Sequence, residues 1–239
     1  MADATASPLA QFLAIIKGVA KRSKHPIPPH ITPLAEGHAL PEPEDLEAGI
    51  GAAGQDLEDA QCACLFANIV NLCITDGRIA DRGLVAFSRD YLRLSERDAR
   101  DVEEAVETRY KLAEEFRNDR EWAIFCAGLF AMAAADDELV ESEKKYLQRF
   151  STDLKHIEAG QKLFDEKGNG IAEELATLNN RQKKIYAAHA IAIMFIDGQW
   201  KGTEQEFMDM VAKRMLIVQF DLQRLLKGLY TLFNVRVFA

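Results

Sequence analysis

The chain contains 239 residues, of which 48% are hydrophobic and 28% are charged, a composition typical of a globular protein with a buried core. The formal net charge of −9 disfavours broad nucleic-acid binding and favours cations or basic partners. The four cysteines lie in apolar runs without a CxxC pair, which disfavours a cysteine metal site and indicates a reducing, cytoplasmic setting.

The first predicted element is an amphipathic helix over residues 9–20. Phe12, Leu13 and Ile16 fall on one face at helical spacing, and basic residues follow them. The apolar run is too short to span a membrane, and no basic stretch precedes it as in a secretory signal. The apolar face can dock on the protein's own domain or on a second copy, whereas residues 9–24 as a whole can lie on an anionic membrane. We expect docking, with peripheral membrane association as the alternative.

A proline-rich segment follows this helix. All seven prolines fall between Pro8 and Pro43, so residues 25–45 should be extended and largely non-helical. The sequence therefore predicts an N-terminal region over residues 1–43, made of the amphipathic helix and an extended leader, and a helical domain over residues 44–239. The three histidines of the leader are expected to be solvated linker residues.

The helical domain is predicted to be all-α, with roughly nine to eleven helices, because helical periodicity recurs nearly throughout it. Three stretches repeat one pattern: an apolar run ending in Asp, then Gly or Asp, any residue, one large apolar residue and a second amphipathic run. The aligned aspartates are Asp76, Asp136 and Asp197, separated by 60 and 61 residues. We therefore expect a bundle built from three helix–Asp-Gly turn–helix units, at about residues 61–120, 121–180 and 181–239.

Each unit begins with a run that is apolar on nearly all sides, which predicts a helix in the centre of a bundle. After the first unit's second helix, Ser95 and Asp98 resemble a capping box, and Val102, Val106 and Tyr110 should line the inner face of the helix that they start. The sequence EKGNG should break the middle unit into shorter helices. Between the helices of each unit, Gly after Asp is expected to end the entering helix in the left-handed conformation.

The most acidic of the three turns, MAAADDELVESE, raises the question of a calcium-binding loop. With Asp137 as the sixth residue of such a loop, Glu143 falls at position 12, as an EF-hand requires. Positions 1 and 3 are then Met132 and Ala134, which offer no side-chain oxygen, so the turn is not an EF-hand. Two explanations of its acidic residues remain open: carboxylates that stabilise the start of the next helix, or a cation site of another kind.

The repeated pattern A-x-A-D-[GD]-x-[ILV]-x-x-x-E, followed by an aromatic residue, resembles the tellurite-resistance TerB family. The stretches FAMAAADDELVESEKKYL and IAIMFIDGQWKGTEQEFM carry the likeness best, and it covers roughly residues 61–235. The resemblance implies an all-helical fold with internal duplication, a role in stress or tellurite responses, and divalent-metal binding by acidic residues at the turns. Gly83 in the first copy and Lys201 in the third depart from the acidic pattern. The positions that would take the metal-binding role are Asp136, Asp137, Glu143, Asp197 and Glu204, and less securely Asp76.

No catalytic set of residues is found: there is no Glu-x-x-His pair, no phosphate-binding glycine loop and no serine nucleophile motif. His189 is expected to be a core histidine with a backbone partner. We therefore predict a non-enzymatic stress-response adaptor that binds protein partners and a divalent cation (Ca²⁺, Mg²⁺ or Zn²⁺), with a helical interaction scaffold that lacks a metal site as the alternative. A homodimer is compatible with either function.

Overall fold

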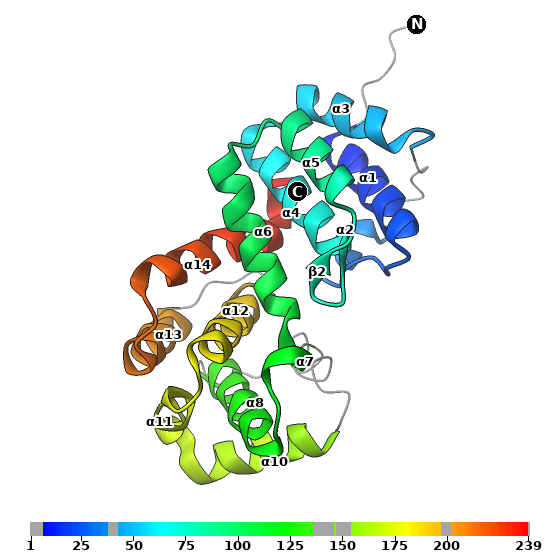
Figure 1. The fold of residues 1–239 in the computed structure, drawn as a ribbon. Helices are drawn as coiled ribbons and strands as arrows, with labels where there is room; N and C mark the ends of the chain where they lie inside the picture. Colours follow the sequence, from blue (N-terminus) through cyan, green and yellow to red (C-terminus); the bar gives the residue numbers. More distant parts are fainter. Residues whose placement is uncertain (1–6, 38–42, 136–145, 147–153, 197–201, 239) are drawn as a thin grey trace, which may run out of the picture. The chain divides into compact units, whose positions relative to one another are not determined.

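A computed structural model describes residues 7–37, 43–135, 146, 154–196 and 202–238 (Figure 1). The chain forms two compact units. Unit 1 is Met1–Glu107 together with Thr231–Ala239, and unit 2 is Thr108–Tyr230. The predicted boundary between residues 43 and 44 does not coincide with a boundary between these units. The first of the three repeated stretches lies in unit 1 and the other two lie in unit 2.

Unit 1 is built around helix α4, whose residues Cys64–Leu72 are all buried. Such a helix needs cover on every side. In unit 1 this cover comes from α1, α5 and a C-terminal 3₁₀ helix, η2, while α3 packs on α1 and α5. The elements of unit 1 are α1 (Pro8–Ser23), α2 (Thr32–Ala35), α3 (Leu46–Asp56), α4 (Asp59–Leu72), β1 (Ile74–Thr75), β2 (Arg78–Ile79), α5 (Arg82–Tyr91), the part of α6 (Glu96–Tyr110) up to Glu107, and η2 (Val235–Phe238).

The predicted N-terminal helix is present as α1 and docks on its own unit. It begins with Ser7 as N-cap, whose hydroxyl accepts a hydrogen bond from Ala10 N–H at 3.2 Å, and with Pro8 in the first turn. Phe12 and Ile16 on its apolar face are 0% exposed, and the Phe12 ring stacks on Phe238 with centroids 4.2 Å apart. The face that could have met a membrane is therefore buried in unit 1.

The leader is mostly non-helical, as predicted, but one of its histidines is wrongly assigned to a solvated linker. His30 Nε2 donates a hydrogen bond to the Asn68 Oδ1 atom at 2.8 Å, and Asn68 is fully buried on α4. The Asn68 amide nitrogen donates in turn to the carbonyl oxygens of Cys64, at 2.9 Å, and Leu232, at 3.1 Å. One buried side chain thus connects the leader and the C-terminal segment to the central helix of unit 1.

The first Asp-Gly turn differs from the prediction. Helix α4 already ends at Leu72, and Ile74–Thr75 pairs with Arg78–Ile79 in an antiparallel hairpin. Asp76 and Gly77 form its two-residue loop with φ values of 51° and 72°, which is the combination that a type I′ turn requires. The hairpin forms because β-branched residues flank an Asp-Gly pair. The expected left-handed helix terminus at Gly77 is therefore wrong for this copy.

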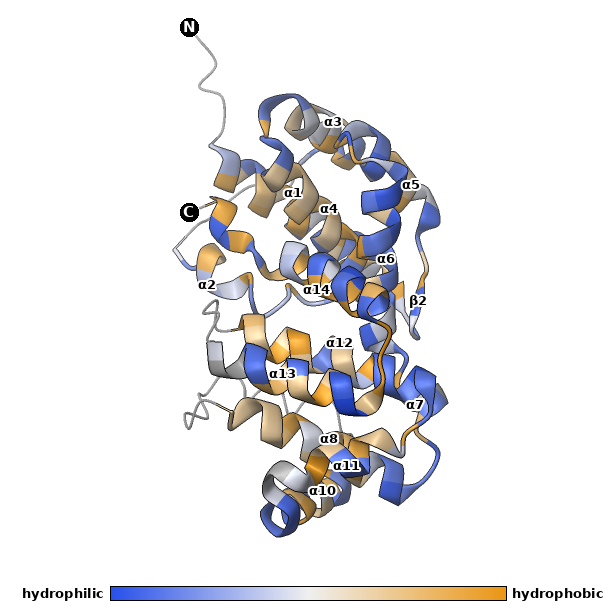
Figure 2. Ribbon diagram, turned by 90° about the vertical axis from the view of Figure 1, so that its left-hand side faces the viewer, coloured by the Kyte–Doolittle hydropathy of each residue, from blue (hydrophilic) through white to orange (hydrophobic). Residues whose placement is uncertain are grey.

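Unit 2 is built around two buried helices, α8 and α12, which pack on each other. Ile185–Phe195 of α12 are all buried, and Figure 2 shows the hydrophobic colouring of α8 and α12 against the hydrophilic colouring of α6. Tyr186 is fully buried and its hydroxyl donates a hydrogen bond to the carbonyl oxygen of Gly128 at 3.1 Å. The elements of unit 2 are the end of α6, α7 (Leu112–Glu115), α8 (Asp119–Ala133), α10 (Leu154–Lys167), the 3₁₀ helix η1 (Gly168–Gly170), α11 (Ile171–Ala176), α12 (Asn180–Ile196), α13 (Gly202–Met215) and α14 (Gln219–Phe233) up to Tyr230.

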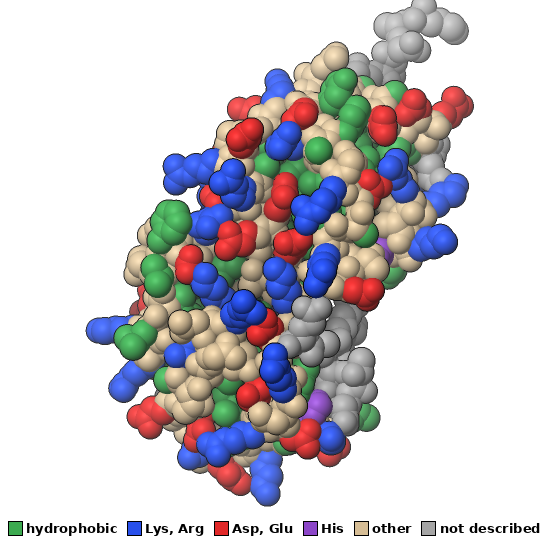
Figure 3. Space-filling model, in the orientation of Figure 1, with side chains coloured by type: hydrophobic (Ala, Val, Ile, Leu, Met, Phe, Trp, Pro, Cys, Tyr) green, Lys and Arg blue, Asp and Glu red, His purple; other side chains and the backbone are tan. Residues whose placement is uncertain are grey.

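The predominantly helical class is confirmed, with the small hairpin as the exception among the described residues. There are more helices than the nine to eleven expected, since the single turns α2 and α7 were not anticipated. The predicted break at EKGNG is present as η1, with Gly168 at φ 50°, and separates α10 from α11. None of the described helices combines the length and the apolar character that a membrane span requires. On the face shown in Figure 3, basic and acidic side chains are interspersed over the described surface.

The closest backbone approach in unit 1 gives a stability test. A Cβ atom added at Gly54 of α3 would overlap the carbonyl oxygen of Tyr91 at the end of α5. We predict that Gly54→Ala destabilises the protein by about 2 kcal/mol or more, because backbone atoms cannot yield as a side chain can. The measurement is urea unfolding followed by far-UV circular dichroism.

Gly51→Ala on the same helix is the matched control. Its added Cβ would lie 3.6 Å from Tyr91 Cδ1, an ordinary contact. Alanine is favoured over glycine inside a helix, so this variant should gain about 0.5–1 kcal/mol. Equal urea midpoints for Gly54→Ala and Gly51→Ala would contradict the packing of α3 against α5.

Candidate functional site

Asp76 is the predicted metal ligand whose backbone and side chain are both described by the structure. Its side chain is exposed at the tip of the β1–β2 hairpin, and its left-handed φ of 51° is one that Asp adopts more readily than most residues. Turn geometry alone therefore accounts for an aspartate here. The next acidic residue, Asp81, serves a different purpose: its carboxylate caps α5 by accepting from Leu84 N–H at 2.9 Å and pairs with Arg22 of α1 at 2.8 Å.

The other predicted ligands cannot be placed in the same way. Asp136, Asp137, Glu143 and Asp197 lie outside the described residues, and Glu204 belongs to helix α13 with its side chain outside the described part. Within the part of the chain that is described, no three His, Cys, Asp or Glu side chains converge as a metal site would need.

A buried polar cluster occupies the core of unit 2, formed by Arg109, Tyr146 and His189. The Tyr146 hydroxyl and the His189 Nδ1 atom are 3.0 Å apart, and Arg109 hydrogen-bonds the same hydroxyl. Because an arginine only donates, the hydroxyl accepts the hydrogen bond from Arg109. The imidazole also hydrogen-bonds the backbone of Arg109, which confirms the expected backbone partner of His189.

The environment of this cluster suits packing rather than proton transfer with solvent. His189 is 0% exposed, and burial together with the Arg109 charge holds its pKa well below the usual value of 6.5. Burial also raises the pKa of the Tyr146 hydroxyl, so neither group changes charge near neutral pH. The cluster thus fixes the end of α6 to Tyr146 and α12 within unit 2.

Arg109 was missed by the sequence reasoning, which placed Tyr110 on the inner face of this helix. Val102 and Val106 are buried as predicted, and the Ser95 hydroxyl caps the helix by accepting from Asp98 N–H at 3.1 Å. Tyr110 is 41% exposed, however, whereas Arg109 is 8% exposed. The signal was present in the spacing, since position 109 lies three residues after 106 and falls on the same helical face.

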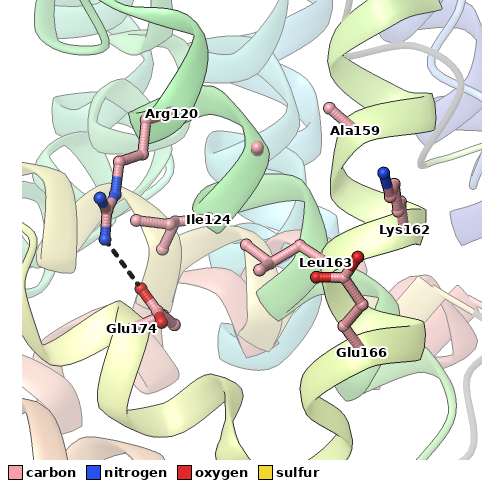
Figure 4. Close-up of a pocket in the computed structure, with 8 residues that line it drawn as sticks. Arg120, Ile124, Ala159, Lys162, Leu163, Glu166 and Glu174 are labelled. Carbon is pink, nitrogen blue, oxygen red and sulfur yellow. Dashed lines mark hydrogen bonds and ion pairs between the residues drawn. The ribbon is translucent and has the colours of Figure 1, made fainter.

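A shallow groove lies on the described surface of unit 2. It lies between α8, α10 and α11, has a volume of about 330 Å³ and has a floor of alanine, isoleucine and leucine side chains (Figure 4). Charged side chains rise from its rim, where Arg120 pairs with Glu174 at 3.4 Å; the same carboxylate also pairs at 3.3 Å with Lys167, which is not a lining residue. The lining residues are Arg120, Ala123, Ile124, Ala159, Lys162, Leu163, Glu166 and Glu174.

The groove combines apolar and charged side chains. Its apolar floor is small, and its rim carries two cations and two anions, so it can bury a short apolar side chain while offering charges of both signs. The lining residues of the groove include no histidine, cysteine, serine or threonine.

The four cysteines are free thiols and buried, as their apolar surroundings predicted. Burial raises the pKa of Cys64, Cys73 and Cys126 to about 12, and it raises the pKa of Cys62 as well. Thiols in this state are poor nucleophiles and poor metal ligands at neutral pH.

Comparisons of the chain with family models, with curated proteins and with solved structures found no match.

The buried imidazole predicts a pH dependence of stability. The folded-state pKa of His189 is depressed, so below about pH 6.5 the unfolded chain takes up a proton that the folded chain refuses. This contribution to stability is complete above pH 6.5 and is lost as the pH falls, by about 1.4 kcal/mol for each unit. We predict that His189→Asn removes this part of the slope between pH 6.5 and 5.5, measured from urea midpoints at each pH.

Tyr146→Phe is the control for that experiment. It removes the hydrogen bond to Nδ1 and should cost about 1–3 kcal/mol at pH 7, but it leaves the imidazole buried. Its pH slope should therefore match the slope of the unmodified chain. Identical slopes for His189→Asn and Tyr146→Phe would show that another group causes the pH dependence.

Proposed function

We propose that this chain is a non-enzymatic, cytoplasmic adaptor of the TerB-like stress-response type, which binds a protein partner and holds a divalent cation at its most acidic turn. The resemblance in sequence supports the type, and the four free thiols are compatible with a reducing compartment.

The observation that carries the proposal is the recurrence of one sequence pattern along the chain. Helices α4, α8 and α12 are each buried along most of their length, and each leads into one of the three aligned acidic turns. Burial explains why the helices are apolar, but it does not require the acidic residues that follow them. Those residues are therefore the part of the repeat that is available for function.

The middle turn is the one to which we assign the cation. Asp136, Asp137, Glu138, Glu141 and Glu143 fall within eight residues, and carboxylates so close in sequence repel one another unless solvent or a cation compensates them. Oxygen ligands of this kind suit the hard cations Ca²⁺ and Mg²⁺.

A second candidate function, a helical interaction scaffold without an ion, is favoured by the geometry of Asp76. The type I′ turn explains that aspartate without any ligand. The groove between α8, α10 and α11 is the surface that we assign to a protein partner under either function.

Calorimetric titration separates the two functions. We predict that chelator-treated protein binds Ca²⁺ or Mg²⁺ with a dissociation constant below 1 mM, and that Asp136→Ala/Glu143→Ala weakens binding at least tenfold, because two of the carboxylates are removed. Zn²⁺ is titrated in parallel.

The control variant is Glu158→Ala/Asp165→Ala, which removes two exposed acidic residues of α10 and the same amount of charge. It should bind the cation as the unmodified chain does. If no cation binds below 1 mM, or if both double variants bind equally well, the cation site is wrong and the scaffold function stands.

A further inference from the structure

The turn between α13 and α14 carries the most exposed large hydrophobic side chain of the described residues. Leu216 is 85% exposed and follows directly after α13 with a left-handed φ of 54°. Its N–H bonds the carbonyl oxygen of Lys213 at 3.3 Å, and Ile217 N–H bonds that of Ala212 at 3.1 Å. This pair of hydrogen bonds defines a Schellman motif, in which the residue at the Leu216 position is usually glycine.

Leucine is therefore unfavourable at this position in two ways: its Cβ is strained by the left-handed backbone, and its side chain faces water. The other non-glycine residues with positive φ among those described are Lys24, Asp76 and Arg93, all of them polar. The Schellman motif explains the left-handed backbone at this position, but it does not explain why the residue there is apolar and exposed.

The neighbouring residues extend the same feature. Val218 directly precedes α14, and its carbonyl accepts the Leu222 N–H at 3.1 Å, so it occupies the N-cap position where Ser, Thr, Asp or Asn would be favoured. Val218 is 62% exposed, and Phe220 in the first turn of α14 is 56% exposed. We call residues 216–220 the apolar turn.

Basic side chains accompany the apolar turn. Lys213 and Arg214 are exposed in the last turn of α13, and neither forms an ion pair with a residue that the structure describes. Arg224 lies over the Phe220 ring at 5.6 Å. Figure 3 shows basic and hydrophobic side chains together over α13 and α14, at the left edge of the view.

The acidic residues near the apolar turn cancel this charge only in part. Asp221 in the first turn of α14 is paired with Lys184 at 2.6 Å, whereas Asp209, one turn before Lys213, keeps its charge and offsets only part of the charge of Lys213 and Arg214. Residues 181–239 carry 9 Lys and Arg against 5 Asp and Glu, although the whole chain has a net charge of −9.

We propose that the apolar turn is a docking site for an anionic lipid surface, with Leu216, Val218 and Phe220 entering the headgroup and acyl boundary and Lys213 and Arg214 contacting the anionic headgroups. Apolar side chains beside exposed cations are the combination that such a surface recognises. The proposal does not depend on the cation site or on the protein partner.

This assignment replaces the membrane contact predicted for residues 9–24. The apolar face of α1 is buried in unit 1, whereas the apolar turn is exposed in unit 2. Each cation near an anionic surface strengthens binding by roughly fivefold. Two basic side chains and three apolar side chains therefore give reversible binding rather than insertion.

The test is co-sedimentation of the full chain with vesicles of phosphatidylcholine alone or with 30% phosphatidylserine. We expect binding to the anionic vesicles only, weakened by salt. Leu216→Asn/Phe220→Ser should bind at least tenfold more weakly, because burial of one leucine side chain already contributes about a factor of ten. Asn tolerates the left-handed backbone, so this variant should melt within about 3 °C of the unmodified chain.

The control variants remove side chains of the same kinds from other parts of the surface. Leu154→Asn removes a leucine that is 70% exposed at the start of α10, and Arg97→Ser/Arg100→Ser removes two exposed cations from α6; both should bind as the unmodified chain does. Lys213→Ser/Arg214→Ser should bind roughly twenty-fold more weakly. Absence of binding to anionic vesicles, or equal binding by Leu216→Asn/Phe220→Ser and Leu154→Asn, would overturn the proposal. Binding of the apolar turn to an acidic protein with no vesicle binding would overturn it too.

Discussion

Three helices that are apolar on nearly all sides impose the main constraint on this molecule. Helices α4, α8 and α12 cannot face water on any side, so each must be enclosed by other segments of the chain. In unit 1 the enclosure uses both ends of the chain, since α1 and η2 both pack on α4. In unit 2 it uses α10, α11 and α13, with α10 approaching so closely that a Cβ at Gly160 would overlap the Cys126 side chain.

Polar side chains on these buried helices determine which segments of the chain pack around the helices. A buried amide or imidazole must find hydrogen-bond partners, or it destabilises the fold by a few kcal/mol. Asn68 on α4 bonds His30 and the Leu232 carbonyl, and His189 on α12 bonds Tyr146 and Arg109. The hydrophobic effect supplies most of the stability, and these two polar clusters specify the arrangement within each unit.

The sequence predicted what depends on periodicity and on single local rules. The buried helices, the amphipathic α1, the cap at Ser95 and the break before α11 all follow from spacing, capping and glycine preferences. It did not predict features decided by distant contacts or by competing local rules, namely the burial of Arg109, the bond between His30 and Asn68, and the type I′ turn at Asp76. Leu216 was missed because left-handed φ is inferred from glycine, and a leucine gives no such signal. The proposed cation ligands from Asp136 to Glu143 remain a prediction.

With its polar and apolar groups placed in this way, the chain keeps its buried interior separate from the surfaces that we assign to binding, namely the groove on α8, α10 and α11 and the apolar turn. The central claim, that α4, α8 and α12 form the cores around which each unit is built, is tested most directly by native-state hydrogen–deuterium exchange. Amides of α4 should exchange more slowly than those of α3 and α5, and amides of α8 and α12 more slowly than those of α10 and α13, because their opening requires unfolding of the whole unit. Exchange of α4 as fast as that of α3 and α5 would contradict the account.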